Sequence, residues 1–362
     1  MNILILTGKF GMGHYSVANT LVQEIERNIP NAETHIQDIF DYTNPFLAKT
    51  VYHAYTLLLN KGSKIYNFFY KKFDENKKLS GLPIPFPYLI SLDHLIEEYQ
   101  PDMILSTLPF CSQLVSEYKE KSDSKLPLIT CITDIGSHSE WITPQTDIYL
   151  VASDLTQQEL EKKGIPKKQI IITGIPVQEQ FKQKVPLKRF AQKQLLIMGG
   201  GLGLLPKEDL FYQHLTCLKN VHITIITGKN ETLYQKLCKD YPEFEVIGFT
   251  DQVHKYMQQA DLIITKPGGI TLFETIYSEL PILAFRPFLS QEIKNADFIK
   301  SHDIGRIMAE EPEYCLYEIA ETIYDDTLLA HYRNNIRYIK ENIPDHALIE
   351  TLNAIKTKDT CA

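Results

Sequence analysis

One run of residues is suited to holding an anion: Leu262-Ile-Ile-Thr-Lys-Pro-Gly-Gly-Ile-Thr-Leu-Phe-Glu274. Its apolar part predicts a buried strand, and Gly268 and Gly269 let the backbone approach a ligand at the start of a following helix. A helix start presents free N–H groups and the positive end of the helix dipole, which suits a diphosphate. Glu274 lies one turn further, where its carboxylate could accept both hydroxyls of a ribose. The block therefore predicts a nucleotide site.

A second glycine run, Gly199-Gly-Gly-Leu-Gly203, follows another predicted strand. Its Gly200 and Gly201 could bring backbone N–H groups against phosphate or sugar. The run lacks both the Gly-Lys-Ser/Thr of a P-loop and the G-x-G-x-x-G spacing of a dinucleotide site. Strand-to-helix turns also need glycine for geometric reasons alone, and that alternative stays open.

A third run, Arg286-Pro-Phe-Leu-Ser-Gln-Glu-Ile-Lys-Asn-Ala296, also follows a predicted strand. Gln291, Glu292 and Asn295 carry the kinds of groups that hydrogen-bond sugar hydroxyls. The alternative is the solvated start of an ordinary helix.

A histidine after the first predicted strand could act as a base. In Gly8-Lys-Phe-Gly-Met-Gly-His14 the glycines, Gly13 among them, permit a tight turn into a helix that begins near His14. A histidine that is neutral near pH 7 can take a proton from an attacking hydroxyl. A purely structural role is the alternative.

A second polar segment, Thr133-Asp-Ile-Gly-Ser-His-Ser-Glu-Trp141, follows another predicted strand. Asp134 could orient His14 or an acceptor hydroxyl, and we count it as a catalytic candidate. His138 and Trp141 could contact an acceptor. Alternatively, Asp134 caps a helix and Trp141 belongs to the core.

Aromatic residues and lysines alternate between residues 51 and 90, a combination that suits the interface of an anionic bilayer. Lysines near such a surface each add about 1 kcal/mol of attraction. An amphipathic helix that only covers a sheet is the alternative. The residues expected to contact membrane or acceptor are Tyr66, Phe68, Phe69, Lys71 and Lys72.

Strand and helix patterns alternate along the chain, which predicts an α/β protein with parallel sheets. We expect an N-terminal domain over 1–178, a linker over 179–194, a second domain over 195–330, and a helical segment over 331–362 that could pack back on the first domain. Loops at the carboxyl ends of the strands would then face a central cleft. The predicted strands are 2–6, 103–106, 128–133, 148–151 and 170–173, then 195–198, 221–227, 245–247, 262–265 and 282–284.

Composition narrows the class of protein. Apolar residues make up 44% and charged residues 23% of the 362-residue chain, which is ordinary for a globular protein. The net charge of −8 argues against a general nucleic-acid binder. The six cysteines are scattered, no stretch is apolar enough to span a bilayer, and no signal peptide precedes the first strand. We therefore expect a cytoplasmic protein. No Asp-x-Asp motif occurs, and we expect no metal requirement.

Taken together, Pro-Gly-Gly-x-Thr-x-x-Glu followed by Gln-Glu-x-x-Asn-Ala resembles the donor signature of the GT-B glycosyltransferases. The resemblance is to the group of monogalactosyldiacylglycerol synthases and processive diacylglycerol glucosyltransferases, related to the peptidoglycan lipid-intermediate N-acetylglucosaminyltransferase. It implies two Rossmann-like domains. Where relatives often have Pro-Gly before Gln-Glu, this chain has Leu289-Ser290, which leaves the donor sugar open.

The resemblance also implies residue roles. Gly268 and Gly269 would face the diphosphate, Thr271 would bind phosphate, and Glu274 would bind the ribose. The residues expected near the donor sugar are Gln291, Glu292 and Asn295; near the uracil, Gly248 and Phe249; and elsewhere around the donor, Gly13, Gly200, Gly201 and Pro267. His14 matches the proposed base or acceptor-positioning histidine.

The implied reaction is an inverting, metal-independent transfer of a hexose from a UDP-sugar to a lipid hydroxyl, with diacylglycerol as the expected acceptor. No cofactor is expected beyond the UDP-sugar substrate. The expected partners are the UDP-sugar, the lipid and an anionic membrane surface at the inner face of the cell membrane, without nucleic acid. The alternatives are a polyprenyl or soluble acceptor, an enzyme like UDP-N-acetylglucosamine 2-epimerase, and a non-catalytic sensor of UDP-sugar or lipid.

Overall fold

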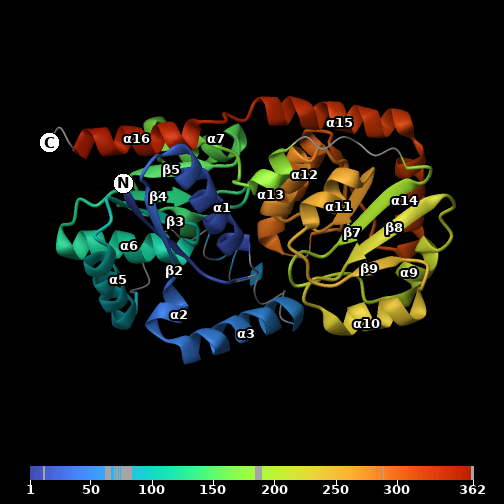
Figure 1. The fold of residues 1–362 in the computed structure, drawn as a ribbon, viewed down its shortest axis with the longest axis horizontal. Coiled ribbons are helices and arrows are strands. Elements are labelled where there is room, and N and C mark those ends of the chain that lie inside the picture. The colour runs from blue at the N-terminus through green and yellow to red at the C-terminus, as the bar shows by residue number, and fades with distance from the viewer. Residues whose placement is uncertain are drawn as a thin grey trace. The chain divides into compact units, whose positions relative to one another are not determined.

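The computed structural model describes residues 1–10, 13–61, 67, 68, 70, 72, 74, 84–183, 190–287 and 289–359. The chain divides into two compact units (Figure 1). The N-terminal unit comprises Met1–Gln178, Leu289–Gln291 and Ile343–Ala362, and the C-terminal unit comprises Glu179–Phe288 and Glu292–Asn342. The last residues of the chain therefore belong to the first unit.

The N-terminal unit contains a six-stranded, all-parallel sheet of order β2-β1-β3-β4-β5-β6. The chain leaves β1 on one side to form β2 and returns on the other side to form β3, so the strand order reverses between β1 and β3. Ligands of such sheets bind at this point. The strands are β1 (Asn2–Thr7), β2 (Glu33–Asp38), β3 (Met103–Ser106), β4 (Leu128–Cys131), β5 (Ile148–Val151) and β6 (Ile170–Ile172).

Helices cover both faces of this sheet. Side chains from α2, α3, α5 and α6 pack on Leu4, Leu6 and Ile104, whereas α1 buries Val17 and Leu21. The helices are α1 (Gly13–Asn28), α2 (Ile39–Thr43), α3 (Pro45–Lys61), α5 (Phe86–Tyr99), α6 (Pro109–Ser122), α7 (Asp154–Lys162) and α16 (Ala347–Asp359), with the 3-10 helices η2 (Ser139–Trp141) and η3 (Lys167–Gln169).

The C-terminal unit repeats the plan with a parallel sheet of order β12-β11-β10-β7-β8-β9. Here the strand order reverses between β7 and β10. The strands are β7 (Lys193–Met198), β8 (Val221–Ile226), β9 (Glu245–Ile247), β10 (Leu262–Thr265), β11 (Ile282–Ala284) and β12 (Gly305–Ile307). The helices are α8 (Glu179–Lys182), α9 (Asp209–Leu215), α10 (Glu231–Asp240), α11 (Val253–Gln259), α12 (Gly269–Tyr277), α14 (Pro312–Tyr324), α15 (Asp326–Glu341) and α13 (Ser290–Ser301), of which the first two residues belong to the N-terminal unit.

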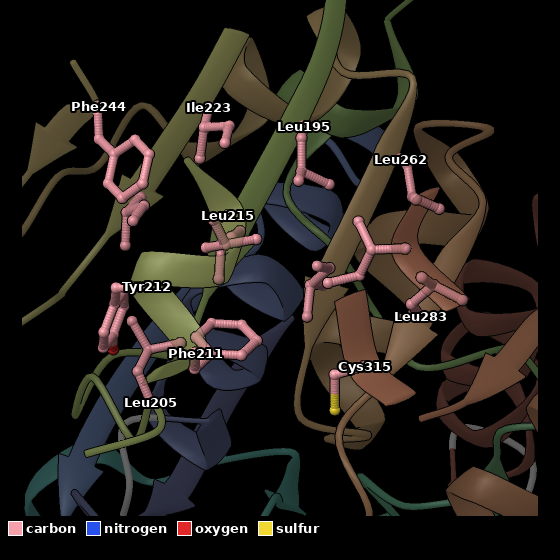
Figure 2. Packing of buried hydrophobic residues seen from close by; sticks show 14 of the residues in the cluster. Leu195, Leu205, Phe211, Tyr212, Leu215, Ile223, Phe244, Leu262, Leu283 and Cys315 are labelled. Carbon is pink, nitrogen blue, oxygen red and sulfur yellow. The ribbon is translucent and has the colours of Figure 1, made fainter. Parts of the chain in front are cut away.

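Apolar side chains fix the central strands of this second sheet. Leu195 of β7 and Ile223 of β8 lie with Phe211 and Leu215 of α9 in one buried cluster (Figure 2). Full burial of such a side chain contributes about 1.5–3 kcal/mol. Because β7 and β10 are anchored in this way, the loops that follow them start from fixed points. The predicted α/β architecture of two doubly wound sheets is confirmed.

Candidate active site

Two glycine-containing loops leave neighbouring strands of the C-terminal unit. Residues 199–203 follow β7, and Pro267 and Gly268 follow β10, which pairs with β7 in parallel. Both loops therefore stand at the point where the strand order of this sheet reverses, the usual place for a ligand. The two sequence blocks are brought to one edge of one sheet.

Packing accounts for several glycines of the first loop. Gly203 has φ +64°, and a Cβ there would lie 1.9 Å from the carbonyl oxygen of Thr227. A Cβ at Gly199 would lie 2.5 Å from the backbone nitrogen of Leu204. The Lys229 N–H donates to the Gly201 carbonyl at 3.0 Å, which ties this loop to the one after β8. At Gly199 and Gly203, close packing of the backbone is by itself enough to require glycine.

The second loop leads into α12 at the same edge of the sheet. Gly268 is the N-cap of this helix, with no side-chain cap, and Gly269 is its first residue. The first N–H groups of a helix lack intrahelical partners and can bind an anion. Asn295 is fully buried, and its Nδ2 donates to the Pro267 carbonyl at 2.9 Å, so it holds this loop in place. Thr271 is 9% exposed in the first turn.

The carboxyl group of Glu274, in α12, has an unusual pKa. Burial raises the pKa of its carboxyl to about 8. Desolvation favours the neutral acid because the charged form loses its hydration. Ligand hydroxyls that donate hydrogen bonds to this carboxyl group would stabilise its ionised form.

Lys266, between β10 and Pro267, is a residue of this edge that was not predicted from the sequence. Its Nζ lies 2.9 Å from Oε1 of Glu292, a carboxylate on α13 that is only 1% exposed. The other oxygen, Oε2, is buried and has no hydrogen-bond partner among the described residues. Gln291, the residue before it, is partly exposed.

The loop after β9 carries the pair expected near a uracil. Phe249 is 62% exposed, and the Nζ of Lys229 lies 5.4 Å from its ring centroid. Gly248 has room for a side chain, since a Cβ there would be 3.9 Å from Tyr234. An exposed aromatic ring beside a cation is able to stack on a base.

His14 begins α1 in the N-terminal unit, at the reversal point of that sheet. Its Nδ1 lies 3.1 Å from Oγ1 of Thr133, which follows β4. Its carbonyl accepts from Oγ1 of Thr107, after β3, at 3.1 Å. Burial lowers the pKa of His14 to about 4, so the imidazole is neutral at neutral pH. Asp134 is the residue predicted from the sequence to orient His14, whereas the hydrogen bond at Nδ1 is made by its neighbour Thr133.

Trp141 and His138 occupy interior positions. Trp141 is 2% exposed in a cluster with Ile132 and Tyr149, and its ring centroid lies 6.1 Å from that of His14. His138 is 4% exposed, and its Nε2 lies 2.8 Å from the Tyr70 carbonyl. Burial would lower the pKa of His138, but Glu140, the Tyr70 carbonyl and Asp74 together outweigh it and the pKa is raised. Both side chains stabilise the protein, and their contact with an acceptor stays a prediction.

The stretch expected to meet acceptor or membrane is described only in part. Tyr66, Phe69 and Lys71 lie outside the described residues. Phe68 is 62% exposed, and the Nζ of Lys72 lies 5.9 Å from its ring centroid. Exposed apolar residues that were not predicted as contacts stand on α3 and α5, both of which pack on α2: Phe46 (87%), Leu47 (50%), Phe86 (70%) and Ile90 (41%).

A cavity of about 390 Å³ lies elsewhere in the C-terminal unit. Gln194, His222 and Glu245 line it, at the amino ends of β7, β8 and β9. The glycine loops stand at the opposite, carboxyl ends, so the cavity is separate from them. Within the described ranges, no helix is long and apolar enough to cross a membrane. In the same part of the chain, no three His, Cys, Asp or Glu side chains are grouped to hold a metal ion.

Known protein families match both halves of the chain. The family model for monogalactosyldiacylglycerol (MGDG) synthase matches residues 14–177, and the glycosyltransferase family 28 C-terminal domain matches residues 194–346. The processive diacylglycerol beta-glucosyltransferase of Staphylococcus carnosus is 30% identical over 368 residues, which cover 97% of this chain and 92% of the relative.

Solved structures share the fold at low identity. MurG of Acinetobacter baumannii has a TM-score of 0.65 and 15% identity, covering 98% of this chain and 99% of MurG. MnaA of S. aureus, solved with UDP, has a TM-score of 0.64 and 14% identity, covering 100% and 97%. From the near full-length relationship and the two-sheet fold, the chain is a glycosyltransferase, and it belongs to the GT-B group that contains the MGDG synthases and the processive diacylglycerol glucosyltransferases.

Proposed function

We propose that this glycosyltransferase moves a hexose from a UDP-sugar to a hydroxyl of diacylglycerol in one inverting, metal-independent step. The observation that carries the proposal is that two glycine loops follow the paired strands β7 and β10, at the point where the strand order of the C-terminal sheet reverses. Glu274 lies one turn into α12, the helix that follows the second loop. The full-length relatives are named for glucosyl transfer to diacylglycerol, and the structural neighbour MnaA binds UDP.

The C-terminal unit would hold the donor. The N-terminus of α12 carries about half a positive elementary charge and free N–H groups, which favour a diphosphate. Glu274 would accept the ribose hydroxyls, and this contact would restore the polar surroundings that its carboxylate lacks. Gln291 and Glu292 would contact the sugar, and Phe249 the uracil, as the resemblance implies.

The N-terminal unit would supply the base. With Thr133 accepting from Nδ1–H of His14, Nε2 carries the free electron pair and takes the proton from the acceptor hydroxyl. The acceptor oxygen attacks the anomeric carbon from the face opposite the nucleotide. The bond from that carbon to the diphosphate oxygen breaks, and the electron pair leaves with UDP. The configuration at the anomeric carbon is thereby inverted.

Charge on the departing diphosphate grows during this step. An electrostatic environment already oriented toward that charge lowers the barrier, and the dipole of α12 supplies one. The chain has no Asp-x-Asp motif of the kind that holds a metal against a diphosphate. Loss of activity on chelation with restoration by magnesium would contradict the metal-independent step.

The acceptor would be reached at a membrane surface. Phe46 and Leu47 on α3 and Phe86 and Ile90 on α5 are exposed apolar residues of the N-terminal unit. Together with Phe68 and Lys72 they provide the apolar and cationic groups that bind an anionic bilayer reversibly. We propose peripheral association at the inner face of the cell membrane on this basis.

The test is UDP release from UDP-glucose, UDP-galactose and UDP-N-acetylglucosamine, each with and without liposomes that contain diacylglycerol. Lipid-dependent release that disappears in His14→Ala supports the proposal and identifies the sugar. The matched control is His346→Ala, an exposed histidine of the same unit. UDP release that requires a soluble or polyprenyl acceptor would show that diacylglycerol is not the acceptor. Formation of an epimerised UDP-sugar would indicate an epimerase. Binding of the UDP-sugar without turnover would indicate a sensor.

A further inference from the structure

Lys266 stands between the two glycine loops. A Cβ at Gly200 would lie 3.3 Å from its Cε, and a Cβ at Gly268 would lie 3.8 Å from Cε and 4.0 Å from Nζ. The lysine side chain therefore occupies the space that these glycines leave open. Its ammonium group lies beside the N-cap of α12 while the side chain remains 24% exposed.

The partner of Lys266 is a carboxylate whose hydrogen bonding is incomplete. Glu292 is 1% exposed, with Oε1 bonded to Lys266 and Oε2 without a partner among the described residues. A buried polar atom without a partner is unfavourable, and a ligand that donates a hydrogen bond would remove that cost. The ion pair thus leaves Glu292 with an oxygen that a ligand hydroxyl would satisfy.

We propose that Lys266 neutralises the diphosphate of the donor, and that it leaves Glu292 to do so. This inference rests on the proposed function. Rotation of the lysine end away from Glu292, beside the N-cap of α12, would bring a full positive charge to the oxygens on which negative charge collects as UDP leaves. Glu292 would then have both oxygens available for hydroxyls of the donor sugar.

If Lys266 leaves Glu292 for the diphosphate, a substitution at Glu292 should affect the affinities for UDP and for UDP-glucose differently. UDP engages Lys266 but leaves Glu292 buried and unpaired, whereas the sugar of UDP-glucose supplies hydroxyls to it. Glu292→Gln should therefore bind UDP at least as tightly as the parent protein and UDP-glucose more weakly. If Lys266 served only to hold Glu292 in place, Glu292→Gln would not change the affinities for UDP and UDP-glucose in these different directions.

Isothermal titration with UDP, UDP-glucose and uridine tests this in the full chain. Because Lys266→Met alone leaves a buried carboxylate without its cation, the informative comparison is Lys266→Met/Glu292→Gln against Glu292→Gln. We expect the double variant to bind UDP about tenfold to a hundredfold more weakly. Uridine, which has no phosphate, should bind both alike, and added salt should narrow the difference for UDP.

The control is Lys239→Met, which removes an exposed lysine on α10 of the same unit. Equal UDP affinity of the double variant and Glu292→Gln would overturn the role of Lys266 while leaving the donor site intact. An equal loss of uridine affinity would overturn it too, by showing a general disturbance of the site. Absence of UDP binding by the parent protein would instead contradict the proposed function itself.

Discussion

Oγ1 of Thr133 lies 3.1 Å from Nδ1 of His14 and joins the end of β4 to the start of α1. In the tautomer in which this hydroxyl accepts from Nδ1–H, Nε2 is the base. Thr133→Val keeps the shape and removes the hydroxyl, and we expect kcat to fall about tenfold or more, as part of the contribution of a general base is lost. Affinity for UDP should not change.

Thr133→Ser is the matched control because it restores the hydroxyl. Steady-state kinetics with saturating lipid separate kcat from KM. If Thr133→Val kept full kcat, or if Thr133→Ser were as slow as Thr133→Val, the hydrogen bond would have no part in the reaction.

The titration of His14 should be displaced far below that of an ordinary histidine. Burial lowers its pKa to about 4, whereas the unfolded chain has a pKa near 6.5. Between these values the unfolded state binds a proton that the folded state does not, so the free energy of unfolding decreases as the pH falls. The full effect is about 3 kcal/mol.

Nuclear magnetic resonance of the histidine ring protons checks this directly. The signal that is missing in His14→Ala should titrate near pH 4, and the stability difference between the parent protein and that variant should change from pH 6.5 downward. A midpoint above about 6 would contradict the burial of this ring.

The raised pKa of Glu274 predicts that, at higher pH, the free energy of unfolding changes with pH in the opposite direction. Burial raises its pKa to about 8, so between about 4.5 and 8 the folded state holds a proton that the unfolded state has lost, and stability falls as the pH rises. The effect on the free energy of unfolding is on the order of 5 kcal/mol in the ligand-free protein. UDP binding should strengthen with pH up to about 8, because the ionised carboxylate is the better acceptor for ribose hydroxyls.

Glu274→Gln should lack the change in stability and keep only the part of the affinity change that comes from ionisation of the terminal phosphate of UDP at about pH 6. Urea unfolding at several pH values and UDP titrations in buffers of different ionisation enthalpy measure them. A parent protein whose UDP affinity was flat between about pH 6 and 8 would exclude Glu274 from the ribose contact.

Gly203 should tolerate no side chain. Gly203→Ala would combine a φ of +64° with a Cβ 1.9 Å from a backbone oxygen, and we expect a loss of stability of more than about 3 kcal/mol. Gly164 has φ +95° with no atom within 4 Å of its Cβ position, so Gly164→Ala should cost only about 1 kcal/mol. Thermal unfolding of both variants makes the comparison, and equal losses would show that strain in φ, rather than the clash, dominates.

The exposed apolar residues of α3 and α5 should determine vesicle binding. Replacing Phe46, Leu47 and Phe86 with serine should weaken sedimentation with anionic vesicles by about tenfold or more, since each removes apolar area from the interface. Tyr314→Ser/Tyr317→Ser removes two exposed aromatic residues of α14 in the other unit as a control. Unchanged vesicle binding by the triple variant would show that other residues of the protein bind the membrane.

Buried parallel strands were the easiest part of the fold to predict. Residues 3–6 and 262–264 are continuous apolar runs, which is typical of strands covered on both faces. By contrast, β2 (Glu33–Asp38) was missed because it is a polar edge strand, and β12 (Gly305–Ile307) because its glycine and arginine leave only one apolar residue in the strand.

The candidate site could be predicted where backbone geometry demands particular residues. Two glycines at a helix start, with Glu274 one turn into that helix, form a combination that is typical of a nucleotide site. Lys266 was missed because a lysine after a strand is usually solvated, and its partner Glu292 comes 26 residues later. Thr133 was missed because its hydroxyl reaches Nδ1 of His14 only through the fold, across 119 residues of sequence, and the role of Asp134 stays a prediction.

The return of α16 (Ala347–Asp359) to the N-terminal unit has a consequence during synthesis. Leu348 and Leu352 are buried in a unit whose main part, Met1–Gln178, leaves the ribosome far earlier. At about 5–20 residues per second, the N-terminal half waits on the order of ten seconds or more for the helix that completes it. Until α16 has emerged, the nascent N-terminal unit therefore exposes the apolar surface that Leu348 and Leu352 cover.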